Sequence, residues 1–217
     1  MQEGTRDRGE LAELACKLTA RSTRFRRSLP DGVVIALSEL VRCMSCYNRN
    51  LTEGYDTRAI DIECALNEDY STDPEKRDLQ LEARAHIAVQ KWMDEGGFEG
   101  KGTSFAGVVK IHRRFCERLP EDLLWVEYPE TKERGKITPG KLRRRYVKAG
   151  GHIPVNPDAL PRLMQRFEDA YEKLGRPDSI IASATAHHRL LWLHPFLDGD
   201  GLMSYAMLRD TLDTGGI

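Results

Sequence analysis

The sequence predicts an all-α fold that is interrupted by one small β-hairpin. Apolar residues recur at three- and four-residue steps over most of the chain, which is the period of an amphipathic helix. Between residues 128 and 157 this period is absent, and prolines and glycines accumulate. There the run 143–148, followed by Gly150 and Gly151, predicts a hairpin instead. The 217 residues are enough for one helical core, so we expect one domain.

The N-terminal part is predicted to contain two helices with a break between them. Residues 8–29 have a helical composition, and the arginines crowded near their end are interpreted as a solvated face. Pro30 and Gly32 break this helix. An apolar pattern from Val33 to Met44 then predicts a second helix that ends near residues 48–54.

Two more helices are predicted in the middle of the chain. Pro74 suits the first turn of a long helix with one apolar face. After a glycine-rich loop, Thr103 or Ser104 can cap the next helix. His112 lies on the apolar side of that helix, where a hydrogen-bonded core residue is the expected role rather than a ligand.

Three helices are predicted after the hairpin. The first begins at Asp158 and is ended by Gly175. Asp178 is expected to cap the second, which Pro195 and the following glycines end. The third runs from about residue 202 to residue 212. The turn between the last two helices therefore lies at a helix N-terminus, where the helix dipole favours anions.

Composition excludes several classes of protein. Lys and Arg number 33 against 34 Asp and Glu, and this balance argues against a dedicated nucleic-acid-binding protein. No apolar run approaches the roughly 20 residues that cross a bilayer, so a cytoplasmic protein without a membrane anchor is expected. Of the five cysteines only Cys43 and Cys46 have zinc-type spacing; no second such pair is present, so this pair is interpreted as buried thiols on a helix.

The segment 194–201, with the sequence HPFLDGDG, is the strongest candidate for a functional site. The imidazole of His194 can take a proton near neutral pH, and the carboxylate of Asp198 can hold a divalent cation. The backbone N–H groups of a glycine-rich loop can form a nest for phosphate oxygens. This combination of groups is suited to nucleotidyl transfer.

The segment resembles the motif H-x-F-x-[D/E]-G-N-G-R-x-x-R of the Fic (filamentation induced by cAMP) domain family. The similarity extends to residues 187–189, 142–155 and 48–54, and it therefore covers most of the chain. It implies a Fic-type helical bundle with an N-terminal helical region at 1–70 and a core at 71–217. The residues that match the motif are His194, Phe196, Asp198, Gly199 and Gly201.

The resemblance implies a protein adenylyltransferase, which moves AMP from ATP to a hydroxyl side chain of a target protein. His194 would be the general base, and Asp198 would hold Mg²⁺ across the α- and β-phosphates. The implied nucleotide-binding residues are Phe196, Gly199, Asp200 and Gly201.

The hairpin at 142–155 corresponds to the flap on which a family member docks its target by strand addition. Arg143, Val147 and Lys148 are the expected docking residues. A competing interpretation is that the basic residues solvate an exposed hairpin edge and so prevent aggregation. A target protein is the expected partner, and a homo-oligomer is the second partner considered.

Glu53 and Gly54 resemble the family's inhibitory motif [S/T]-x-x-x-E-[G/N], although Arg49 stands at the Ser/Thr position. In the family this glutamate pairs with the second motif arginine. That arginine is absent here, so Arg49 or Arg189 is the alternative partner. A helix-capping or surface role for Glu53 is the competing interpretation.

Three departures from the motif weaken the predicted phosphate site. Asp200 replaces the family's Asn, and Leu202 and Tyr205 stand at the arginine positions. The run from Leu202 onward also reads as a helix that has lost one four-residue turn containing both arginines, or the natural protein carries residues that this sequence lacks. Two alternatives follow: a catalytically dead interaction module of the same fold, or a metal-dependent phosphoester hydrolase or de-adenylylating enzyme.

Overall fold

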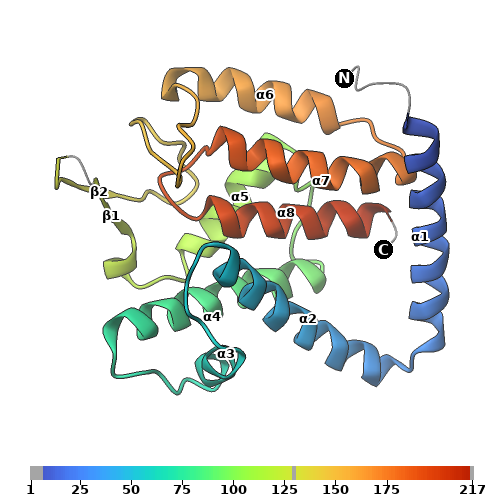
Figure 1. The fold of residues 1–217 in the computed structure, drawn as a ribbon, viewed down its shortest axis with the longest axis horizontal. Coiled ribbons are helices and arrows are strands. Elements are labelled where there is room, and N and C mark those ends of the chain that lie inside the picture. The colour runs from blue at the N-terminus through green and yellow to red at the C-terminus, as the bar shows by residue number, and fades with distance from the viewer. Residues whose placement is uncertain (1–6, 129–130, 216–217) are drawn as a thin grey trace.

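The protein is a bundle of α-helices with one small two-stranded sheet at its edge (Figure 1). The structure, a computed structural model, describes residues 7–128 and 131–215. In these ranges the helices and strands are α1 (Arg8–Ser28), α2 (Asp31–Thr52), α3 (Ala59–Leu66), α4 (Pro74–Asp94), α5 (Phe105–Cys116), β1 (Trp125–Glu127), β2 (Arg134–Lys136), α6 (Leu160–Tyr171), α7 (Arg176–Leu193) and α8 (Asp200–Gly215).

The main core lies between α5, α6, α7 and α8. Figure 1 shows α6, α7 and α8 side by side, with α5 behind them, and α1 running crosswise past the end of α7. The connection from α7 to α8 is at the opposite end of the pair. Large side chains that are fully or almost fully buried fill this core: Val108, Ile111, Phe115, Met164, Leu190, Phe196, Met203 and Met207.

A second, smaller cluster joins α2 and α3 to the bundle through α4. Cys46 of α2 and Ile62 of α3 pack with Ala83 and Ile87 on one side of α4. The other side of α4 faces the main core through residues such as Val89. This arrangement brings the C-terminal end of α2 toward the α7–α8 connection.

Local sequence signals set the start of two helices. The Asp73 side chain accepts a hydrogen bond from the N–H of Glu75, and Pro74 occupies the first turn of α4. The Ser104 hydroxyl accepts from the N–H of Gly107 at 2.9 Å, which confirms Ser104 as the cap of α5. Asp178 is not a cap, because α7 already begins at Arg176 and Asp178 lies in its first turn.

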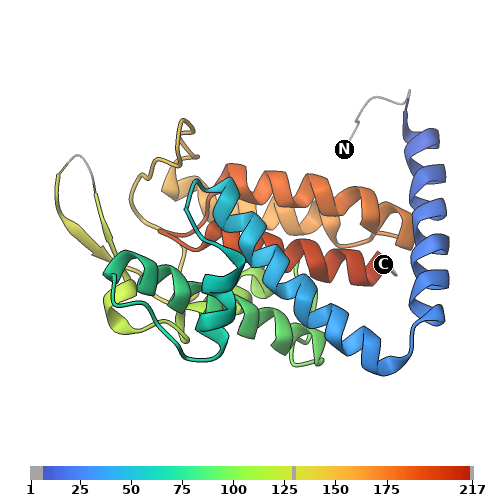
Figure 2. The same cartoon turned by 60° about the horizontal axis from the view of Figure 1, so that its bottom comes forward.

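The predicted hairpin at 142–155 is wrong: the two strands lie earlier in the chain. Residues 142–155 contain only one antiparallel bridge, between Ala149 and His152. The strands are β1 and β2, with Trp125 opposite Lys136, and Figure 2 shows them projecting from the helices. The side chains of Arg134 and Lys136 both lie over the Trp125 ring, so local cation–π contacts stabilise the pair.

Within the described ranges, no helix is long and apolar enough to cross a membrane.

Candidate active site

The predicted site is the connection between α7 and α8, and its backbone is sharply turned. His194 ends α7 in the left-handed conformation, with φ 47°. Gly199 has φ 82°, and its carbonyl accepts the first helical hydrogen bond of α8 from Met203. A side chain at Gly199 would also contact the rings of Phe115 and His112. A glycine therefore fits this position both for its φ and for the space around it.

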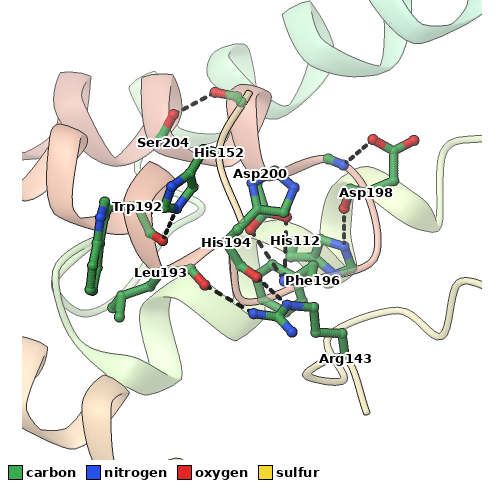
Figure 3. Close-up of polar contacts among 12 residues, drawn as sticks. His112, Arg143, His152, Trp192, Leu193, His194, Phe196, Asp198, Asp200 and Ser204 are labelled. Carbon is green, nitrogen blue, oxygen red and sulfur yellow. Dashed lines mark hydrogen bonds and ion pairs between the residues drawn. The ribbon is translucent and has the colours of Figure 1, made fainter. Parts of the chain in front are cut away.

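His112 holds the turn in place from inside the core. Its ring is stacked on Phe196, with 3.7 Å between centroids and 4° between planes. Gly140 donates its N–H to His112 Nδ1 at 2.9 Å, so Nε2 carries the proton. Nε2 donates to the Asp198 carbonyl at 3.1 Å (Figure 3). The interpretation of His112 as a hydrogen-bonded core residue is confirmed. Phe196 is fully buried and anchors the turn, so it is not placed to contact a nucleotide.

Asp200 also points into the turn rather than toward solvent. Its side chain has no exposed surface, and both carboxyl oxygens accept from the N–H of Phe196, at 3.2 and 3.3 Å. The expectation that Asp200 binds nucleotide does not fit this position, and neither does a cation shared by His194, Asp198 and Asp200. Among the described residues no three His, Cys, Asp or Glu side chains are grouped so that they could hold a metal.

His194 lies beside Asp200, with 3.3 Å between Nε2 and Oδ2. Burial lowers the pKa of His194, and the nearby Arg143 guanidinium lowers it further. Burial raises the pKa of Asp200 well above its ordinary value. Both directions favour the uncharged pair, and an uncharged imidazole is the form that accepts a proton.

Asp198 is the exposed carboxylate of the turn. Its Oδ1 accepts from the N–H of Gly199 at 2.7 Å, which fixes the side chain at the surface. An exposed carboxylate on a fixed loop next to a helix N-terminus has the donor chemistry that Mg²⁺ prefers. The predicted metal ligand therefore fits the cation.

Arg143 links the segment 142–155 to the end of α7. Only 3% of the residue is exposed, and its guanidinium donates to the carbonyls of His194 at 2.6 Å, Val155 at 2.6 Å, Arg145 at 3.0 Å and Leu193 at 3.4 Å. The Arg143 N–H donates to the Pro195 carbonyl. Figure 3 shows this side chain below the turn. Docking of a target on Arg143 is excluded by its burial, and its role is to position the flap.

The rest of the flap has an exposed surface. Lys148 is exposed and Val147 is half-buried. Two large side chains that the sequence analysis did not select are more exposed, Tyr146 at 62% and Ile153 at 72%. The signal for them was present in the sequence, since each is an apolar or aromatic residue in a segment without helical period. His152, between them, donates from Nε2 to the Trp192 carbonyl at 2.9 Å and holds the flap against α7.

Glu53 reaches the α7–α8 turn from the end of α2. A Cβ atom at Gly201 would overlap Glu53 Oε1, so the carboxylate lies directly against the first turn of α8. Arg49 holds it with two hydrogen bonds, Nε to Oε1 at 3.1 Å and Nη2 to Oε2 at 2.8 Å. Of the two predicted partners, Arg49 is the one that forms these bonds to Glu53. Arg189 lies over the Tyr171 ring.

Glu82 of α4 also belongs to this group of charges, although no motif in the sequence pointed to it. Its Oε2 lies 3.8 Å from Arg49 Nη1. Burial raises the pKa of Glu82 to about 7, against the opposing effect of Arg49, and Asp198 and Glu53 raise it as well. Glu53 and Glu82 therefore flank one guanidinium at the edge of the turn. This charge balance disfavours an additional anion while Glu53 is in place.

The buried His112 makes stability depend on pH. Burial lowers its pKa from 6.5 to about 4, so between these values the unfolded chain binds more protons than the folded chain. We expect the free energy of unfolding to fall as the pH decreases through this window, by about 3 kcal/mol from this residue. Chemical denaturation between pH 4 and pH 7.5 measures it.

The His112→Phe variant keeps the stacking on Phe196 and removes the titrating group. It should be less stable at pH 7, because the Asp198 carbonyl and the Gly140 N–H lose their partner, but its pH dependence should be shallower. Part of the slope remains because burial also lowers the pKa of His86, to about 3. The exposed control His188→Ala should keep the full slope. An unchanged slope in His112→Phe would contradict the assignment.

Residues 103–212, about half of the chain, match the sequence model of the Fic/DOC family. The matched segment begins just before α5 and includes the whole α7–α8 turn. It does not include α2, so the helix that carries Arg49 and Glu53 lies outside the match.

Curated relatives match a shorter segment. The protein adenylyltransferase Fic of Drosophila willistoni is 39% identical over 84 residues, which are 37% of this chain and 16% of that protein. The protein of the same name from Drosophila melanogaster is 39% identical over 82 residues, 37% of this chain and 17% of that protein. The match thus spans about a sixth of the length of these relatives.

Solved structures match nearly the whole fold. A Fic family protein from Desulfovibrio desulfuricans G20 superposes with a TM-score of 0.65 at 15% identity, covering 97% of this chain and 58% of that chain. A fragment of Fic-1 from C. elegans gives a TM-score of 0.63 at 16% identity, with 96% and 58% covered. At these identities the similarity concerns the fold alone. The fold match therefore includes α1 to α4, which the sequence match omits.

Proposed function

The chain belongs to the Fic/DOC family, and we propose that it transfers AMP from ATP to a hydroxyl side chain of a target protein. The observation that supports this reaction most directly is the position of His194. Its half-buried imidazole stands at the turn into α8, and burial lowers its pKa so that the ring is uncharged at neutral pH. A general base of this kind contributes about 10² to 10⁴ in rate.

In the proposed reaction His194 accepts the proton of the target hydroxyl. The hydroxyl oxygen forms a bond to the α-phosphorus of ATP, the bond from that phosphorus to the β-phosphate oxygen breaks, and pyrophosphate leaves. The carboxyl group of Asp200 lies 3.3 Å from Nε2; it is uncharged in the resting pair and would balance the imidazolium only by giving up its own proton. The Arg143 bond to the His194 carbonyl keeps the strained residue in position.

Asp198 would hold Mg²⁺ at the surface of the turn. The cation, when bound, would neutralise part of the charge on the phosphates. Mg²⁺ keeps several waters and substrate oxygens in its coordination shell, so a single protein carboxylate is a sufficient anchor.

The flap at 142–155 is the proposed docking surface for the target. Val147 and Lys148 remain candidates, and the exposed Tyr146 and Ile153 offer more contact area. An extended target segment lying along the flap would bring its hydroxyl toward His194, since Arg143 fastens the flap to the His194 carbonyl. A cytoplasmic location, where ATP is available, is part of the same proposal.

Glu53 is the proposed inhibitory residue. Its carboxylate lies against Gly201, at the helix N-terminus where a phosphate group would be favoured. Like charge and direct overlap would both oppose ATP while Glu53 stays there. Glu53→Ala is therefore expected to raise AMP transfer by about tenfold or more.

The test is the transfer of label from [α-³²P]ATP to proteins of a lysate and to the chain itself, in the presence of Mg²⁺. Glu53→Ala should label proteins more strongly than the unaltered chain. Glu63→Ala is the matched control, because Glu63 is an exposed carboxylate on α3 that does not contact the turn. Absence of label in every variant would mean that AMP transfer is the wrong chemistry.

A second candidate is an interaction module that keeps the Fic fold and binds no nucleotide. The pairing of Glu53 and Glu82 with Arg49 favours this alternative, as does the absence of both motif arginines. Calorimetry separates the two, since the module would give no heat with Mg-ATP even after Glu53→Ala.

A further inference from the structure

We propose that Arg49 is the phosphate-binding cation of this chain. Its guanidinium is now occupied by Glu53 and would bind phosphate oxygens of ATP once the Glu53 carboxylate has left. The inference rests on the proposed function for its ligand, ATP, but it concerns binding rather than transfer. In the family motif, arginines of the helix after the turn would contact the phosphates. The inference assigns this phosphate contact to Arg49 of α2.

The Glu53 carboxylate occupies a site that is built for an anion. On one side is the first turn of α8, against which Oε1 lies at Gly201. On the other side is the Arg49 fork, with Nε and Nη2 each bonded to one carboxylate oxygen. A helix N-terminus and an arginine fork both bind phosphate groups in proteins. The carboxylate therefore stands where a phosphate would have both.

Arg49 has one donor that the present arrangement leaves unused. Its side chain is 6% exposed, and Nη1 is buried without a hydrogen-bond partner. Glu82 Oε2 is 3.8 Å from Nη1, beyond hydrogen-bond distance. Arg49 also lines a small pocket together with Glu82, Asp198 and Gly199, which places it next to the turn.

The other arginines around the turn have different roles. Arg143 donates to four backbone carbonyls, and Arg189 lies over the Tyr171 ring. Arg209, farther along α8, pairs with Asp94 at 2.9 Å. Leucine and tyrosine stand at the motif's arginine positions, 202 and 205. Arg49 pairs with Glu53, whose carboxylate lies against the N-terminal turn of α8.

The geometry also defines how binding and inhibition are related. A carboxylate and a phosphate accept the same paired bonds from an arginine fork, so Glu53 and ATP would compete for one partner. Removing Glu53 should then increase affinity only if Arg49 is still present. If Arg49 served solely to hold Glu53, removing Arg49 would release the carboxylate and also increase affinity. The two roles therefore predict opposite effects of an Arg49 substitution.

Isothermal titration with Mg-ATP, and separately with inorganic triphosphate, tests the inference without measuring transfer. Glu53→Ala should bind both ligands about tenfold more tightly than the unaltered chain, and Arg49→Gln added to it should abolish that gain. Arg49→Gln alone should give no gain. Arg49→Lys with Glu53→Ala should lie between, because lysine keeps the charge and loses the fork.

Arg42→Gln in the Glu53→Ala background is the matched control. Arg42 is also a buried arginine of α2 with a carboxylate partner, Asp94 at 2.5 Å, but it does not line the turn. The double variant Arg42→Gln/Glu53→Ala should bind Mg-ATP with the same affinity as Glu53→Ala. Comparison with it separates loss of a phosphate contact from loss of folding, and the lysine variant serves if Arg49→Gln does not fold.

Three results would overturn the inference: equal affinity of Glu53→Ala with and without Arg49, tighter binding by Arg49→Gln alone, or no binding of Mg-ATP and triphosphate by any variant. The proposed function fails in a different way. Binding that depends on Arg49 without AMP transfer to any protein would support the phosphate contact and contradict the transferase.

Discussion

The His194→Asn variant is expected to lose AMP transfer by a factor of about 10² to 10⁴, because it removes the group that accepts the proton of the target hydroxyl. Asparagine suits the test because His194 has φ 47°, and asparagine adopts this left-handed conformation more readily than alanine does. The backbone that Arg143 holds should therefore stay in place. Transfer of labelled AMP is measured in the Glu53→Ala background, where the inhibitory carboxylate is absent.

The control for this substitution is His188→Ala, which removes an exposed imidazole from the same helix. It should transfer AMP at the rate of its parent. Mg-ATP binding by His194→Asn should also remain close to that of its parent, since His194 is proposed to act on the target hydroxyl. Unchanged transfer by His194→Asn would show that another group is the base.

The Arg143→Leu variant is expected to lower the free energy of unfolding by about 3 kcal/mol or more. Arginine donates here to four backbone carbonyls, and leucine would leave the buried ones without a donor, at about 1 to 3 kcal/mol for each unsatisfied group. Loss of the guanidinium should loosen the contact between two regions, because the bonded carbonyls belong both to the flap and to the end of α7. Urea denaturation of the variant measures the effect.

Arg145→Leu is the matched control for this prediction. Arg145 is two residues away and exposed, and its guanidinium pairs with Glu133 at 2.6 Å on the surface. Exposed ion pairs contribute about 0 to 1 kcal/mol, so this variant should be nearly as stable as the unaltered chain. Equal destabilisation by both substitutions would contradict the positioning role of Arg143. A stable Arg143→Leu variant would contradict it as well.

Helix periodicity and capping located most of the helices because these signals are local. Pro74 and Ser104 begin α4 and α5 as predicted, and Gly175 separates α6 from α7. The prediction failed for the strands, since the pattern at 143–148 suggested a ladder where Arg143 is instead bonded to carbonyls of α7. The strands β1 and β2 are three residues each, too short for a clear alternating pattern. Helix α3, with eight residues, was missed for the same reason.

The candidate site was predicted correctly in its location and only partly in its roles. The residue types at 194–201 identified a turn with a base, a carboxylate and two glycines. They did not show that Phe196 and Asp200 face inward, because both orientations are compatible with the same motif. The tertiary structure decides between the two orientations. His112 stacks on the Phe196 ring inside the turn, and the Phe196 N–H donates a hydrogen bond to the Asp200 carboxyl group.

The sequence by itself determined the helical class, the turn at 194–201 and its glycines, and the spacing that lets Arg49 pair with Glu53 one helical turn later. These features depend on neighbours along the chain. Only the tertiary structure decided that this pair lies against Gly201, that Glu82 joins it, and that Arg143 is buried. Those contacts join residues from α2, α4, the flap and the α7–α8 turn. They arise because α4 packs between two hydrophobic clusters and so brings the end of α2 to the start of α8.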